Sequence, residues 1–174
     1  LSNGMKVVYK KTTFKEDEIV MSGWSYGGVS ALDQSDAFTL QVLPDVITLG
    51  GVGDFSAIDL PKVLAGKKVR VSPSIDNYES GISGNCSPKD LETMMQLVYL
   101  YFTNPRSDND AYASYIQRTK AMLANNELNP QITLMDTINS VLYNNHPLAL
   151  RMKTEDYDTV DYAKAMEMYK TLLY

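Results

Sequence analysis

Residues 35–53, SDAFTLQVLPDVITLGGVG, decide the fold expected for this chain. Ser35 is a good helix N-cap, and apolar side chains then recur at the three- and four-residue intervals of one helix face. Two adjacent glycines follow and end the helix, because glycine tolerates the backbone conformations found at helix C-termini. We therefore predict a buried amphipathic helix here. Its inward positions are Ala37, Leu40, Leu43 and Ile47.

The composition describes one globular domain rather than a nucleic-acid or membrane protein. With 174 residues, 44% of them hydrophobic, the chain is long enough for a single domain with a sizeable core. Its formal charge of −5 argues against a nucleic-acid or anionic-lipid surface, since both require clustered Lys and Arg. No apolar run is long enough to span a bilayer. The single cysteine, Cys86, fits a reducing compartment or a disulfide-free exported protein equally.

Strand patterns come early in the chain and helix patterns come late. Residues 5–9 and 17–25 are β-rich, residues 68–74 alternate with Val69 and Val71 on one face, and residues 78–86 are expected to complete a hairpin. After Ser87-Pro88 the chain is predicted to be helical. This order favours an α+β fold of two layers, with an antiparallel sheet and helices packed on one face.

The late helices are recognised by stripes of apolar residues. We expect them near residues 91–102, 110–125, 132–142 and 161–174, after one short helix that ends at Gly66. The predicted inward positions are Leu91, Met94, Met95, Val98 and Phe102; Tyr112, Tyr115, Ile116, Met122 and Leu123; Ile132, Met135, Ile138 and Leu142; and Ala163, Met166, Tyr169 and Leu172.

Gly23-Trp24-Ser25-Tyr26-Gly27 is a literal G-x-S-x-G, the pattern of the nucleophile elbow in α/β-hydrolases. That mechanism needs a histidine base and an oxyanion loop from an earlier strand. Too little chain precedes Ser25 for those strands, and the only histidine, His146, lies in a predicted turn. A surface serine at the end of a strand is therefore the favoured interpretation. In the same way, the glycines of residues 50–53 indicate a helix stop rather than a nucleotide loop, because no Lys-Ser or Lys-Thr follows them.

Within the first helix, Gln41, Pro44 and Asp45, followed by Gly50, occupy the spacing of H-x-x-E-H and glycine, the zinc motif of the inverted zincins. In that motif two histidines on one helix face bind zinc, and the glutamate beside them activates a water. Glutamine is a poor zinc ligand, and proline has no group that transfers protons. We therefore predict no catalytic, cofactor-binding or metal-binding residue in this chain.

Several short segments along the chain match a known family. No single segment is specific, but their order and spacing together are. The segments are Leu1-Ser2-Asn3-Gly4-Met5-Lys6-Val7, Ser25-Tyr26-Gly27-Gly28, Gly51-Val52-Gly53-Asp54-Phe55-Ser56, Leu64-Ala65-Gly66-Lys67, Val71-Ser72-Pro73, Ser87-Pro88-Lys89-Asp90-Leu91-Glu92, Tyr99-Leu100-Tyr101-Phe102-Thr103 and Asn145-His146-Pro147. On these segments essentially the whole chain resembles one lobe of the insulinase/pitrilysin family of zinc metallopeptidases. The resemblance is to the non-catalytic second half of bacterial members.

The resemblance implies a lobe that works with a second, homologous lobe. In such enzymes two halves close like a clamshell around an unfolded peptide, and one half binds zinc. The family's third zinc ligand, a glutamate on a later helix, would fall within residues 116–124, which contain no acid; Glu127 lies beyond them. The chain is therefore interpreted as a non-enzymatic lobe that helps to enclose peptide substrates. Zinc is expected in the catalytic half, which lies in the same polypeptide or in a homologous subunit.

Other implications concern the extent and location of the lobe. Family lobes continue past the final helix into a further strand and helix, so residues 1–174 are expected to be a single lobe truncated before those elements. The resemblance favours the periplasm over the cytoplasm. Two alternatives remain: a structural or binding scaffold subunit of the same family without a proteolytic role, and, more remotely, a serine hydrolase that uses Ser25.

Overall fold

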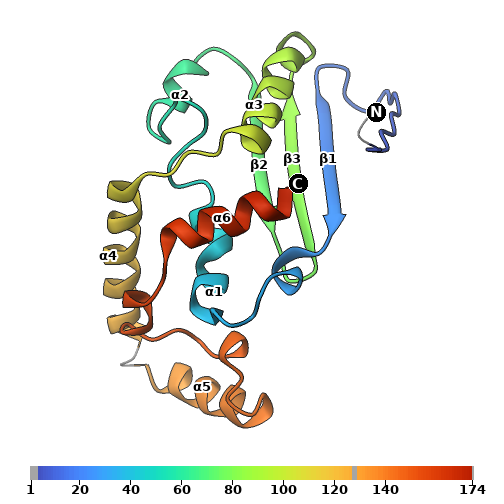
Figure 1. Cartoon of the computed structure of the whole chain (residues 1–174). Coiled ribbons are helices and arrows are strands. Elements are labelled where there is room, and N and C mark those ends of the chain that lie inside the picture. Colours follow the sequence, from blue (N-terminus) through green and yellow to red (C-terminus); the bar gives the residue numbers. More distant parts are fainter. Residues whose placement is uncertain (1–3, 127–128, 174) are drawn as a thin grey trace.

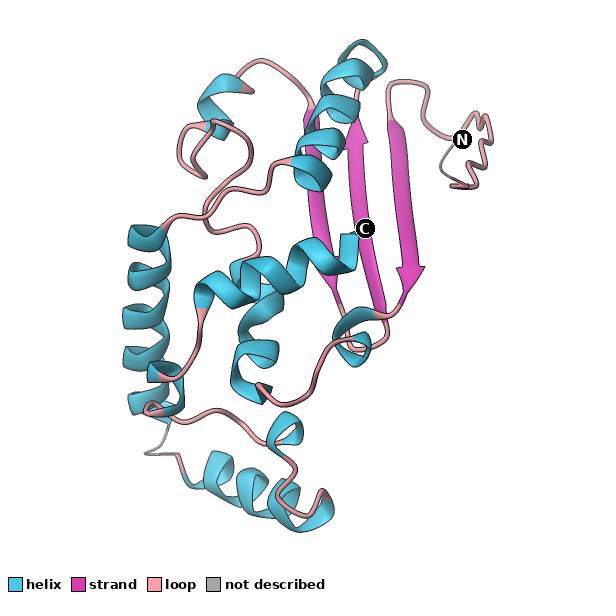
Figure 2. Cartoon of the chain, viewed as in Figure 1, coloured by secondary structure: helices cyan, strands magenta, loops and turns pink. Residues whose placement is uncertain are grey.

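A computed structural model describes residues 4–126 and 129–173 of the chain (Figure 1). Residues 1–3, which open the matching segments, lie outside the described residues, as do Glu127 and Tyr174. The described part forms two layers. Helices cover one face of a small sheet, and the other face is open (Figure 2).

The sheet contains three antiparallel strands in the order β1-β3-β2. They are β1 (Ile19–Tyr26), β2 (Val69–Ile75) and β3 (Glu79–Cys86). The predicted hairpin of residues 68–74 and 78–86 is confirmed by the pairing of β2 with β3, and the predicted strand at residues 17–25 is β1. Side chains alternate between faces, so that Val71 and Ile82 are buried under the helices while Ser74 and Ser83 face solvent.

The helices follow the predicted order, and the predicted α+β class is confirmed. Their bounds in the described residues are α1 (Ala37–Val46), α2 (Leu60–Val63), α3 (Leu91–Thr103), α4 (Asn109–Asn126), α5 (Pro130–Leu142) and α6 (Tyr162–Leu173). Short 3-10 turns occur at Gly28–Ala31, Pro88–Asp90, Pro147–Ala149 and Asp156–Asp158.

Helix α1 is buried as its apolar spacing predicts. Leu40 and Leu43 are 1% and 0% exposed. The predicted N-cap is wrong by one residue: Asp36 rather than Ser35 caps the helix, because its carboxylate accepts the Thr39 N–H. The helix continues through Pro44 to Val46, so proline does not end it.

Helix α6 crosses α1 and completes this part of the core (Figure 1). Met166 and Tyr169 are buried as predicted, whereas Ala163 is exposed and the neighbouring Ala165 takes the buried place. The Tyr169 hydroxyl donates to the Tyr101 carbonyl oxygen at 3.3 Å, which joins α6 to the end of α3.

Helix α3 packs against β2 and β3 through a face rotated from the predicted one. Met94, Leu97 and Tyr101 are buried in a second cluster with side chains of the sheet. The predicted inward residues Leu91 and Met95 are 37% and 44% exposed instead. Apolar spacing identifies residues on the same side of a helix, but α3 carries apolar residues on both sides, so the covered side could not be chosen from spacing alone.

The apolar stripe of α5 is not covered in the described structure. Met135, Ile138 and Leu142 are 53%, 39% and 70% exposed, contrary to their predicted inward position. This helix lies at the end of the molecule farthest from the sheet (Figure 1) and is joined to the following loop by an ion pair between Arg151 and Asp136. Met122 on α4 is likewise exposed, whereas Leu123 is buried.

The strand predicted at residues 5–9 is wrong for this structure. These residues form no strand, and Val7, Val8 and Tyr9 are 67%, 82% and 83% exposed. Local β-propensity makes a strand only where a partner supplies hydrogen bonds and a surface to pack on.

The turn after β1 depends on glycine. Gly27 and Gly28 have φ of 136° and 57°, and a Cβ on Gly28 would lie 2.2 Å from the Asp76 carbonyl oxygen. The Val29 N–H donates to that same oxygen at 2.9 Å, so the close approach links the end of β1 to the β2–β3 turn.

We predict that Gly28→Ala destabilises the fold far more than Gly66→Ala. Both glycines have positive φ, but a Cβ on Gly66 would meet nothing within 4 Å. Gly66→Ala should therefore cost only the backbone strain, about 1 kcal/mol, whereas Gly28→Ala adds a backbone clash and should cost about 3 kcal/mol or more. Urea denaturation of the two variants measures the difference, and equal costs would show that the Gly28 contact is not tight.

Candidate functional site

The three positions that match the zinc motif lie on α1 at its outer side. Pro44 and Asp45 are exposed, and Gln41 is half-buried. The buried face of the same helix holds Leu40 and Leu43 in the core, which fixes the direction in which the motif positions point.

The carboxylate of Asp45 is engaged by helix α4. The Tyr115 hydroxyl donates to Asp45 Oδ2 at 2.9 Å. Tyr115 directly precedes residues 116–124, the stretch in which the family resemblance places an acidic zinc ligand. Helix α4 therefore contacts Asp45, the last motif position, through the phenol hydroxyl of Tyr115.

The side-chain amide of Gln41 contacts the turn that follows helix α5. Its Nε2 donates to the Pro147 carbonyl oxygen at 2.6 Å. Pro147 begins a 3-10 turn that is preceded by His146, whose Nδ1 accepts the Leu148 N–H. The motif positions thus connect α1 to α4 and to the turn after α5.

Electrostatics keep the hydroxyl of Tyr115 protonated. Burial, followed by the negative charge of Asp45, raises the pKa of Tyr115 far above its ordinary value. The same two causes raise the pKa of Tyr157, which lies in the loop before α6. Tyr115 is therefore a hydrogen-bond donor to Asp45 throughout the physiological pH range.

These residues do not fit a zinc ion. The motif positions supply one carboxylate, which already accepts a hydrogen bond, and one amide, which already donates one. Zinc sites use thiolates, imidazoles and carboxylates in sets of three or four. Across residues 4–126 and 129–173, no group of three or more His, Cys, Asp or Glu side chains is arranged to hold a metal.

Ser25 lies inside strand β1, where it is paired with Ser80 of β3, and its side chain is exposed. A nucleophile elbow instead places its serine on the sharp turn between a strand and a helix. Here the turn begins at Gly27, two residues later. The G-x-S-x-G pattern is therefore the end of a strand followed by a glycine turn.

The glycine segment after α1 packs against the protein's own backbone, at Arg106, and does not form a phosphate-binding loop. A Cβ on Gly50 would lie 2.1 Å from the Arg106 carbonyl oxygen, and Arg106 Nη1 donates to the Gly50 carbonyl oxygen at 2.8 Å. The close approach of the two backbones explains why this position is glycine.

Comparisons with known proteins find similar sequences among zinc proteases. No family model matches the sequence. A zinc protease PQQL-like protein of Arabidopsis thaliana is 26% identical over 172 residues, which is 98% of this chain and 16% of that protein. A probable zinc protease PqqL of Haemophilus influenzae is 24% identical over 120 residues, 69% of this chain and 13% of that protein.

Two solved structures share the fold. The crystal structure of the periplasmic protease PqqL from Escherichia coli superposes with a TM-score of 0.81 at 17% identity, over 98% of this chain and 19% of that one. The ferredoxin protease FusC, solved as a mutant in complex with Arabidopsis ferredoxin, gives a TM-score of 0.71 at 12% identity, over 90% and 17%.

These matches to zinc proteases agree with the sequence resemblance to the insulinase/pitrilysin family. Within this class the chain's matches are to proteases of the PqqL type. The chain spans less than one-fifth of the length of each relative and structure that it matches.

We predict that Tyr115 and Asp45 are energetically coupled. In a double-mutant cycle with Tyr115→Phe and Asp45→Ala, the coupling free energy should be about 1 kcal/mol, the value of a hydrogen bond at a partly exposed site. Chemical denaturation of the four proteins measures it. Additive effects of the two substitutions would contradict the hydrogen bond.

The same bond predicts a loss of stability at alkaline pH. The unfolded chain ionises its tyrosines near pH 10, whereas the folded state keeps Tyr115 protonated because its pKa is raised. The stabilising contribution is therefore intact below about pH 10 and is lost as the pH rises further. Tyr115→Phe should reduce this alkaline loss, and Tyr143→Phe, at a position 55% exposed, is the control that should not.

We also predict that Ser25 is not a nucleophile, because no histidine forms a hydrogen bond with it. A fluorophosphonate probe should label the chain no more than it labels Ser25→Ala. Labelling that disappears in Ser25→Ala but persists in Ser22→Ala, a second exposed serine of β1, would restore the hydrolase hypothesis.

Proposed function

We propose that the chain is the non-catalytic lobe of a zinc-dependent endopeptidase, which helps to enclose peptide substrates together with a zinc-binding half. The proposal rests on the hydrogen bonds that the side chains at the motif positions make within the chain. Gln41 and Asp45 hydrogen-bond to neighbouring elements of the lobe itself, and Pro44 has no side-chain group for proton transfer.

Two further observations support it. Both curated relatives are named as zinc proteases and are far longer than this chain, so the zinc chemistry of such a protein has room to lie elsewhere. Residues 116–124 contain no acid, so α4 offers no carboxylate from the stretch in which the family's third ligand is expected. A lobe without these ligands contributes shape and charge to a chamber.

Residues 1–174 are proposed to belong to one such lobe, with its catalytic half in the same polypeptide or in a homologous subunit. The PqqL structure is that of a periplasmic protease, and we propose the same compartment for this protein. No helix among the described residues has the combination of length and hydropathy that a membrane span requires. FusC is described in complex with a ferredoxin, which supports a small protein or a peptide as the class of substrate.

A scaffold subunit without any proteolytic role is the second candidate. The exposed apolar side chains of α5 favour it, since a scaffold needs a surface for another protein. The two functions differ in what happens to peptide cleavage by the catalytic half. A lobe that encloses substrate is required for cleavage, whereas a scaffold is dispensable for it.

We predict that the isolated chain binds no stoichiometric zinc and cleaves no peptide. The protein is purified with added zinc, its metal content is determined by elemental analysis, and cleavage of a fluorogenic peptide is followed in parallel. Because Gln41 and Asp45 replace imidazole ligands, both readings should equal those of the Gln41→Ala, Asp45→Ala double variant. Tightly held zinc or chelator-sensitive cleavage that the double variant lacks would contradict the proposal.

A further inference from the structure

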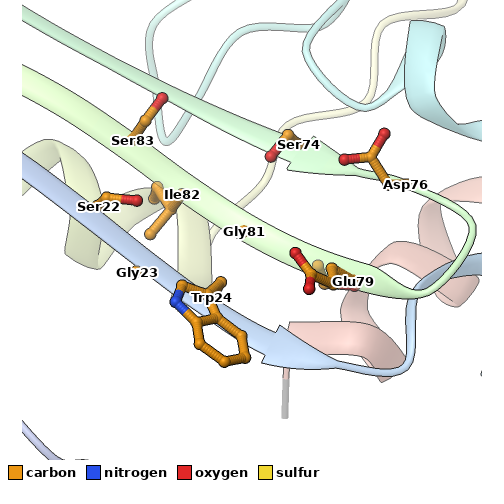
Figure 3. A pocket seen from close by; sticks show the side chains of 10 residues that line it. Ser22, Gly23, Trp24, Ser74, Asp76, Glu79, Gly81, Ile82 and Ser83 are labelled. Atoms are coloured by element: carbon orange, nitrogen blue, oxygen red, sulfur yellow. The ribbon is translucent and has the colours of Figure 1, made fainter.

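The open face of the sheet carries a shallow groove above the middle of β3, on the side away from the helices (Figure 3). It encloses ≈ 180 Å³ and is lined by residues from all three strands. Pockets for drug-sized ligands occupy roughly 300–1,000 Å³. This groove is therefore of a size for one side chain.

Gly81 forms the floor of the groove. It is paired with Trp24 on one side and with Ser74 on the other. A Cβ at this position would lie 3.1 Å from Ser74 Oγ and 3.2 Å from the Gly23 carbonyl oxygen. The absence of a side chain leaves the space between the two neighbouring strands open.

Trp24 forms one wall. Its side chain is 61% exposed, and the ring of Tyr26 meets it edge-on, with ring centroids 5.0 Å apart and planes at 76°. An exposed indole face carries negative π-electron density, and it is the aromatic surface that binds cations best.

Two carboxylates lie at the end of the groove next to the β2–β3 turn. They belong to Asp76 and Glu79, and neither takes part in an ion pair among the described residues (Figure 3). Their backbone positions are fixed, because the Asp76 N–H donates to the Glu79 carbonyl oxygen at 2.8 Å and the Gly27 N–H donates to the Tyr78 carbonyl oxygen at 2.8 Å. The end of the groove is therefore negative and rigid.

We propose that this groove binds an arginine side chain of an extended peptide. The planar guanidinium lies against the indole of Trp24 and donates hydrogen bonds to Glu79 and Asp76. A guanidinium can stack and donate at the same time, which an ammonium cannot do equally well. An apolar side chain fits poorly, because it would desolvate the two carboxylates without pairing them.

The inference deepens the proposed function, on which it rests for the source of the peptide, by naming a preference for basic substrates. The chain itself carries competing cations, because the exposed segment before β1 contains Lys10 and Lys11. Their ammonium groups cannot stack on the indole and pair with two carboxylates as a guanidinium does, so the proposed occupant is the arginine of a free peptide.

The test follows the indole N–H signal of Trp24 by NMR in the 174-residue chain, which contains one tryptophan. The probes are capped alanine pentapeptides with arginine, lysine or glutamine at the centre. Arginine should shift the signal saturably, with an affinity about fivefold or more above that of glutamine, and lysine should fall between them. Glu79→Gln and Gly81→Ala should each weaken arginine binding.

The matched control is Glu92→Gln, which removes an exposed carboxylate from α3 on the opposite face of the sheet. It should leave arginine binding unchanged. If Gly81→Ala fails to fold, Glu79→Gln, at an exposed position, still decides the question. Equal affinity for arginine and glutamine, or equal effects of Glu79→Gln and Glu92→Gln, would overturn the inference.

The Lys10→Gln, Lys11→Gln variant should bind the arginine peptide with unchanged affinity. A shift of the Trp24 signal in this variant without any peptide would show that the chain's own segment occupies the groove, and it would overturn the inference. Failure of the groove remains distinguishable from failure of the proposed function. The enclosure role is judged by cleavage of the glutamine peptide in the intact protein that contains this lobe, and that reaction does not require arginine recognition.

Discussion

The packing of α1 against α6 is the contact on which the rest of the structure depends. Leu43 and Tyr169 are both 0% exposed at this contact, in the larger of the two apolar clusters. Polar groups fix the register of the two helices, because the N–H that precedes α6, from Asp161, donates to the buried Thr39 hydroxyl at 3.1 Å. Lys164 pairs with the capping carboxylate of Asp36 at 3.1 Å, so that one acid both begins α1 and holds α6. Neither helix can rotate without losing these bonds together.

This constraint determines what the motif positions can do. With one face of α1 committed to the core, Gln41 and Asp45 must face α4 and the turn at Pro147, and their polar groups are engaged there. The same helix geometry that aligns metal ligands in a working zinc motif here aligns two structural hydrogen bonds. The proposed loss of metal binding would therefore need no change of fold, only a change of the side chains on the outer face of α1.

Much of this organisation could be predicted from the sequence, and the limits have physical causes. Residues with alternating or helical spacing identified β2, β3 and α1, whereas the interpretation of Gln41, Pro44 and Asp45 as an altered zinc motif stays a prediction. The Tyr115 contact was missed because it joins residues 70 positions apart, and neither local pattern predicts the other. The orientations of α3 and α5 and the isolation of residues 5–9 depend on which surfaces meet in three dimensions. The groove was missed for the same reason, since Gly81 forms its floor only because Trp24 and Ser74 lie beside it on the adjacent strands.

The central claim, that this lobe has a structural and not a zinc-binding role at its motif positions, is tested most directly in the intact protein that contains it. Gln41→Ala and Asp45→Ala are introduced together in this lobe, and zinc content is measured by elemental analysis after dialysis. The account predicts the same zinc content as in the unaltered protein, with lower thermal stability because two inter-element hydrogen bonds are lost. A stoichiometric loss of zinc, of about one ion per protein molecule, at unchanged thermal stability would show that these side chains are ligands and would contradict the account.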